Sequence, residues 1–60
     1  MNIDIERLRK DLIDYFGSAI SIMPIAIIDL SKVEKASEIE LIKIAEDNNF
    51  DLEDYIIKTR

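Results

Sequence analysis

The chain has 60 residues with 13 acidic and 8 basic side chains, a formal net charge of −5, and neither cysteine nor histidine. The length predicts a single domain, residues 1–60, and the composition excludes disulfide bonds and metal sites built from thiolate or imidazole ligands. The acidic balance argues against nucleic acid and anionic lipid as partners.

The first predicted element is an amphipathic helix over residues 4–16. Apolar residues recur there at spacings of three and four and fall on one side of a helix, with charged residues on the other; the apolar set is Ile5, Leu8, Leu12, Tyr15 and Phe16. Gly17, the only glycine, is well placed to end this helix. The apolar stripe nevertheless continues through Ala19 and Ile20, so the sequence leaves a break and a continuation open.

Residues 17–30 allow three structures: a continuation of the first helix, a separate helix, or an extended segment. Their isoleucines suit a strand, but no other segment alternates as a strand would, so a strand here has no partner. Pro24 is suited to the first turn of a helix. We therefore predict a second helix over 24–30, followed by a polar connection over 29–37 with Val33 as its one apolar anchor.

A third helix is predicted over residues 38–47. Ser37 and Glu40 form the Ser-x-x-Glu pattern of a capping box directly before an apolar run. Asn48 and Asn49 follow the run and tolerate the left-handed conformation that ends helices.

The last predicted element is a short helix over 52–58, capped by Asp51. Phe50 precedes this cap and is placed to pack on Tyr55 as a hydrophobic staple. Together the elements predict an all-α fold, a small bundle of three to four short helices.

Few side chains suit catalysis, because the serines have no histidine to activate them. The acids from Asp47 onward resemble a calcium loop, but Leu52 stands at the sixth position in place of glycine and Lys58 at the twelfth in place of glutamate. We predict that the protein is not an enzyme and has no resident cofactor or metal. Whether the acidic corner near the last turn binds a cation stays open; it comprises Glu46, Asp47, Asp51, Glu53 and Asp54.

The helices predicted over 38–47 and 52–58 are joined as in a helix-turn-helix. The second of them begins with acids at 51, 53 and 54, which repel the phosphates that such a helix approaches. We therefore predict no binding to nucleic acid.

No targeting or membrane-spanning segment is expected. The N-terminal residues lack the basic and apolar regions of a signal peptide. The longest apolar stretch, 19–28, is interrupted by Ser21 and Pro24 and is shorter than a membrane span. These features predict a cytoplasmic protein that is not in the membrane.

The stretch over residues 40–52 resembles leader peptides of ribosomally made natural products, of the nitrogen-fixation type, which look like Glu-Leu-x-x-x-Ala-x-x-x-Gly-Phe. Leu41, Ala45 and Phe50 match this pattern, and Asn49 replaces the glycine. The double-glycine cleavage site of such leaders is missing, so we do not carry the leader function over.

A surplus of apolar residues is the feature that bears most on function. The segment 19–30 is apolar on nearly every side, and for its stability a chain of this size without cysteine or histidine is left with idealised helix packing or a partner subunit. We predict a non-enzymatic helical interaction module that self-associates, most simply as a symmetric dimer. The candidate interface residues are Ile20, Met23, Ile25 and Ile27. Two alternatives stay open: the segment is a monomer's core, or the protein is an acidic regulatory partner that binds a basic surface of another protein.

Overall fold

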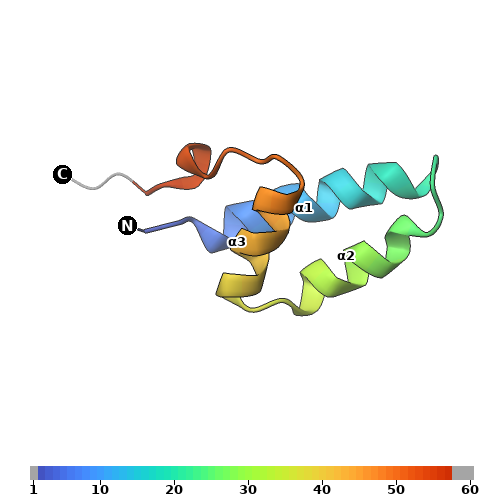
Figure 1. Ribbon diagram of the computed structural model, residues 1–60, viewed down its shortest axis with the longest axis horizontal. Coiled ribbons are helices and arrows are strands. Elements are labelled where there is room, and N and C mark those ends of the chain that lie inside the picture. Colours follow the sequence, from blue (N-terminus) through green and yellow to red (C-terminus); the bar gives the residue numbers. More distant parts are fainter. Residues whose placement is uncertain (1, 58–60) are drawn as a thin grey trace.

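A computed structural model describes residues 2–57 of the chain and confirms the all-α prediction (Figure 1). Three α-helices, α1 (Ile5–Ile20), α2 (Ala26–Lys35) and α3 (Glu38–Asp47), are followed by a single 3₁₀ turn, η1 (Leu52–Tyr55). The described part is elongated, 42 × 18 × 17 Å. α1 and α2 form a hairpin whose turn lies at one end, while both ends of the described chain lie at the other (Figure 1).

The first helix is longer than the minimum that the sequence predicts. The Asp4 side chain caps it by accepting a hydrogen bond from the Arg7 backbone N–H (3.2 Å). The helix passes through Gly17, which has no positive φ, and ends at Ile20. Of the two open alternatives, the structure therefore shows the continuation.

The bounds predicted for the second helix, 24–30, are wrong. Pro24 lies in the turn before α2, and the helix continues to Lys35 through most of the segment predicted as a polar connection. The cause is a second apolar stripe, in which Ala26 and Val33 are buried and Leu30 is half-buried. Their spacings of four and three place all three on one side of the helix, toward α1.

The third helix has the bounds that the sequence predicts. The Glu40 backbone N–H donates to Ser37 Oγ (3.3 Å) and the Ser37 N–H donates to Glu40 Oε1 (3.1 Å), so both halves of the capping box form. At the other end, Asn48 Nδ2 donates to the Ile44 carbonyl (2.8 Å) and Asn49 takes a φ of 63°. The predicted end signal is confirmed.

The last predicted helix, 52–58, is wrong within the described residues, because only the turn Leu52–Tyr55 forms and residue 58 lies outside them. Asp51 does cap the turn by accepting the Glu53 N–H (3.0 Å). The chain then runs extended beside the N-terminal segment: Asp4 N–H donates to the Tyr55 carbonyl (2.6 Å) and Ile57 N–H to the Asn2 carbonyl (2.8 Å).

These two bonds flank an isolated antiparallel bridge between Ile3 and Ile56. Pairing with the N-terminal segment thus replaces the helical bonds expected after Tyr55. Phe50, expected to pack on Tyr55, instead has its ring edge-on to Tyr15 of α1, with the centroids 5.3 Å apart.

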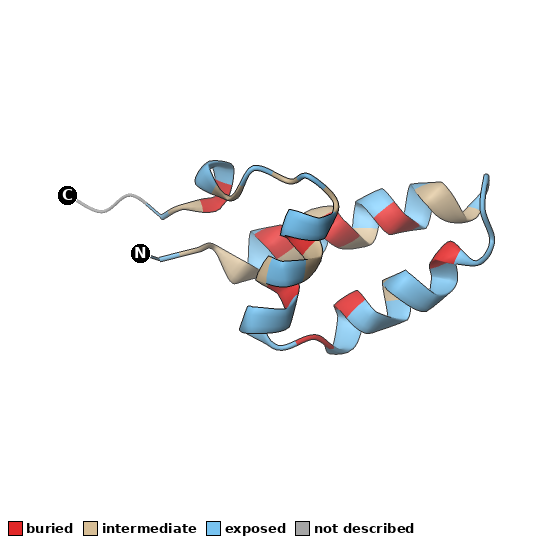
Figure 2. Ribbon diagram, viewed as in Figure 1, coloured by how far each residue is buried: buried red, intermediate tan, exposed pale blue. Residues whose placement is uncertain are grey.

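The core lies where the three helices meet (Figure 2). Its largest fully buried side chains are Leu8, Leu12, Val33 and Leu41. Arg9 links α1 to α2, because its Nη1 donates to the Val33 carbonyl (2.9 Å) near the end of α2. α3 packs on the half of α1 that lies away from the hairpin turn (Figure 1). The half of the hairpin next to the turn consists of two helices with no third layer among the described residues.

Candidate functional site

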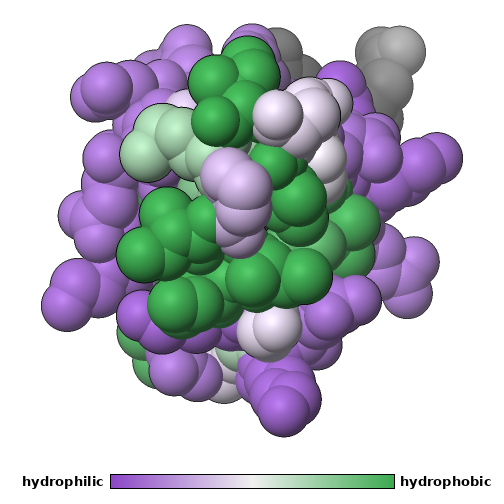
Figure 3. All heavy atoms as spheres, turned by 90° about the vertical axis from the view of Figure 1, so that its right-hand side faces the viewer, coloured by the Kyte–Doolittle hydropathy of each residue, from purple (hydrophilic) through white to green (hydrophobic). Residues whose placement is uncertain are grey.

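The most exposed apolar surface of the described residues is the turn between α1 and α2 with the first turn of α2. Five large apolar side chains there are 51–84% exposed, and Figure 3 shows apolar side chains gathered over this end. We call this surface the apolar tip; it comprises Ile22, Met23, Ile25, Ile27 and Ile28. Monomeric proteins rarely leave such a group uncovered unless it binds something.

The local fold explains why these side chains point outward. Ile22 and Met23 N–H both donate to the Ala19 carbonyl, which closes the end of α1 and turns the chain. The Ala26 N–H donates to the Met23 carbonyl (2.9 Å), so a helical turn begins at once. Because Ala26 faces α1, its neighbours at 25, 27 and 28 face away from the core.

The tip carries no charge. Residues 15–28, which lie between Asp14 and Asp29, contain no acidic or basic side chain. The net charge of −5 therefore belongs to the remainder of the molecule, and another surface approaching the tip has no side-chain charge to desolvate.

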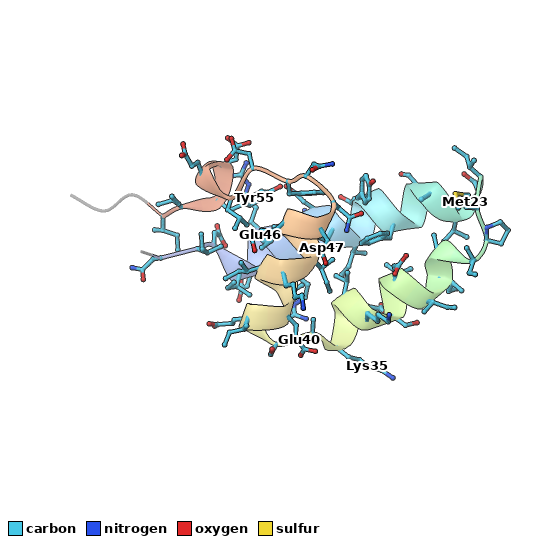
Figure 4. The ribbon with its side chains drawn as sticks, viewed as in Figure 1. Met23, Lys35, Glu40, Glu46, Asp47 and Tyr55 are labelled. Carbon is cyan, nitrogen blue, oxygen red and sulfur yellow. The ribbon has the colours of Figure 1, made fainter. Side chains whose placement is uncertain are left out.

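Three of the four candidate interface residues lie on the tip. Met23, Ile25 and Ile27 are exposed there, and Figure 4 shows Met23 at the end of the hairpin. Ile20 is half-buried at the end of α1 and offers less surface. Ile22 and Ile28 belong to the same apolar run but are not among the interface residues that the sequence predicts. Whether these residues form an interface stays a prediction.

A groove of about 720 Å³ lies between α2 and α3 and begins at Ile28 of the tip. Most of its surface consists of apolar atoms, although only three of its lining residues are apolar, Ile28, Ala36 and Ile44. All three lysines of α2 and α3 also line it, together with two acids; the charged set is Lys32, Lys35, Lys43, Glu40 and Asp47. Figure 4 shows Lys35 and Glu40 where α2 passes into α3, at the end of the groove away from the tip.

The chain matches no protein-family model, no curated protein and no solved structure.

The residues of the acidic corner have separate structural roles. Asp51 caps η1, Asp47 lines the groove, and Asp54 presents its backbone carbonyl to Arg7 Nη1 (3.3 Å). Among residues 2–57, no three acids are grouped so that they could hold a metal ion. In the same part of the chain, no helix is both long and apolar enough to cross a bilayer.

Among residues 2–57, two titratable groups have shifted pKa values, and both are explained by local structure. Burial, the hydrogen bond from its hydroxyl to Asp11 Oδ2 (2.5 Å) and the Asp11 charge raise the pKa of Tyr55 to about 12. The backbone and hydroxyl hydrogen bonds of Ser37 lower the pKa of Glu40. Tyr55 does not line the groove, and Glu40 is engaged in its capping box. These shifts reflect folding contacts and do not indicate a reaction centre.

Proposed function

We propose that the protein is a helical interaction module that self-associates through the apolar tip, most simply as a symmetric dimer. The observation that carries the proposal is the group of five exposed apolar side chains on an uncharged end of the hairpin. A second copy fits this surface because an uncharged patch lets two acidic molecules meet without placing like charges in contact.

The energy available from the tip is large enough for association. Full burial of an Ile or Met side chain contributes about 1.5–3 kcal/mol. Because the five are 51–84% exposed, covering one tip contributes at most about 5–9 kcal/mol. A symmetric dimer covers two tips, and the sum offsets an association cost of about 4–15 kcal/mol.

Sedimentation equilibrium at tens to hundreds of micromolar tests the proposal. The wild-type chain is expected to show the mass of two chains, and Ile25→Asp that of one, because a carboxylate on the tip must be desolvated to form the dimer. Ile25 is the N-terminal cap residue of α2, is 66% exposed and makes no capping bond, so aspartate there meets the positive end of the helix dipole and removes no core contact.

Ile39→Asp is the matched control. Ile39 is 81% exposed and lies in the first turn of α3, away from the tip, so its replacement adds the same charge near the start of a helix. We expect Ile39→Asp to remain a dimer. A wild-type chain that is monomeric over the whole concentration range, or an equal loss of the dimer in both variants, would contradict the proposal.

A further inference from the structure

Two tips that meet end to end offer less area than specific complexes usually bury. A face of 18 by 17 Å has a projected area of roughly 300 Å², whereas specific complexes bury about 800 Å² on each partner. A long side of 42 by 18 Å offers roughly 750 Å², close to that standard size. A dimer built on the tip reaches the standard size only if the contact extends along the side of the molecule.

The groove between α2 and α3 lies on such a side and complements the tip in shape. It is concave and mostly apolar, whereas the tip is the protruding end of a hairpin. Ile28 belongs to both surfaces, so tip and groove are continuous within one copy. The aliphatic stems of the groove lysines add apolar contact for an inserted side chain.

The charges of the groove also suit the tip. The tip adjoins the C-terminal end of α1, the negative end of the helix dipole, and α1 has no basic residue in its last turn. The start of α2, which is the positive end of its own dipole, lies beside the end of α1. Asp29 in the first turn of α2 offsets that positive end. A positive charge near the end of α1 is therefore favourable, and the groove of a second copy carries three lysines against two acids, Glu40 and Asp47.

A two-fold axis brings the two surfaces together twice. α2 has 10 residues and is therefore about 15 Å long, with the tip at its start and the far end of the groove at its end. An axis beside the middle of α2 places the two α2 helices antiparallel, so that the tip of each copy reaches the groove of the other. This is the reciprocal contact that an isologous dimer requires.

We infer that, in the dimer, the tip of each copy inserts into the α2–α3 groove of its partner, with the two α2 helices antiparallel. The inference rests on the proposed self-association and specifies its geometry. The second copy, and not an unrelated molecule, is the occupant that the projected areas, the continuity of the two surfaces and the complementary charges favour.

Cysteine cross-linking tests this arrangement cleanly because the chain has no cysteine of its own. Ile22→Cys marks the tip and Lys43→Cys the groove, and both positions are exposed. A disulfide forms only when the two Cα atoms approach within about 7 Å. Equal mixtures of the two variants are oxidised, and the linked species are identified by mass spectrometry.

We expect the mixed product, in which an Ile22→Cys chain is linked to a Lys43→Cys chain, to exceed severalfold the product of two Ile22→Cys chains. Lys10→Cys, at an exposed position on α1 outside the groove, is the control partner and should give little product with Ile22→Cys. Met23→Cys repeats the test from a second tip position.

The two ways in which the experiments can fail are distinguishable. If the tip-to-tip product of Ile22→Cys dominates, or if the Lys10→Cys mixture links as well as the Lys43→Cys mixture, the groove arrangement is wrong. In that case a dimer in sedimentation still supports self-association. A monomeric wild-type chain in sedimentation overturns both the arrangement and the proposed function.

Discussion

Replacing Tyr55 by phenylalanine removes one oxygen atom from the contact that joins the C-terminal turn to α1. The Tyr55 side chain is 7% exposed, and its hydroxyl donates to Asp11 Oδ2 at 2.5 Å. Arg7 lies over its ring, 5.2 Å from the centroid. The substitution keeps the ring, and with it the packing and the cation–π contact, so it isolates the hydrogen bond.

The expected cost follows from the nature of that bond. Hydrogen bonds to charged groups contribute about 1.5–3 kcal/mol. Asp11 is half-buried and regains water when the hydroxyl is removed, so the lower end, about 1.5 kcal/mol, applies. For a domain of this size each kcal/mol changes Tm by about 4–8 °C, so we expect a decrease of about 6–12 °C.

The assay is thermal unfolding followed by circular dichroism at one fixed protein concentration, since association makes Tm depend on concentration. Tyr15→Phe is the matched control, because Tyr15 is 47% exposed and loses the same atom at the surface of the same core. An unchanged Tm in Tyr55→Phe, or an equal decrease in both variants, would refute the assigned role of the Asp11 bond.

The pH dependence gives a second readout. Tyrosine in the unfolded chain ionises near its ordinary value of 10.0, whereas Tyr55 in the folded chain has a pKa raised to about 12. A group whose pKa is raised on folding stabilises the fold fully at pH values below its unfolded pKa. This contribution is lost as the pH rises through its folded pKa. The difference in stability between wild type and Tyr55→Phe should therefore shrink between pH 10 and pH 12. A constant difference across that range would contradict the assignment.

Two further predictions concern the helices. Ser37→Ala should lower the free energy of unfolding by about 1 kcal/mol because it removes the capping hydroxyl of α3; Ser31→Ala, exposed within α2, is the control in chemical denaturation, and equal effects would exclude a capping role. Gly17→Ala should raise the free energy of unfolding by about 0.5–1 kcal/mol, because Gly17 lies inside α1 with nothing within 4 Å of an added Cβ. A destabilised Gly17→Ala variant would mean that α1 breaks at this residue.

Signals that act within a few residues made most of the fold predictable from the sequence. The capping box of Ser37 and Glu40 fixes the start of α3, and Asn48 and Asn49 fix its end. Asp51 likewise marks the start of η1. The side chains of Ser37, Asn48 and Asp51 each bond to a backbone group at most four residues away, so their effect needs no knowledge of the tertiary structure.

The bounds of α2 and the end of the chain depend on contacts that the local sequence does not contain. Along α2 and its cap the strongest apolar residues, at 25, 27 and 28, face solvent, while Ala26 and Val33 face the core. Hydrophobicity alone therefore does not indicate which side of α2 is buried. After Tyr55 the chain leaves the helical path because it pairs with Asn2 and Asp4, far away in sequence.

The candidate site was predictable in part for the same reason. The segment 19–30 is apolar on more sides than one neighbour can cover, and the structure leaves Met23, Ile25 and Ile27 exposed. The groove was not predicted, because it lies between α2 and α3 where both helices pack on α1, and it runs along residues that the sequence assigned to a connection.

The bridge between Ile3 and Ile56 places the two ends of the described chain next to each other, opposite the tip. This arrangement makes the fold suitable for circular permutation: a short peptide can join the ends, and new termini can be opened in the exposed turn at residues 21–25. In such a permutant the hairpin turn becomes two free chain ends, while the core of Leu8, Leu12 and Leu41 keeps its contacts. Comparing the permutant with the original chain would therefore show separately what the turn contributes by linking α1 to α2 and what its exposed side chains contribute as a surface.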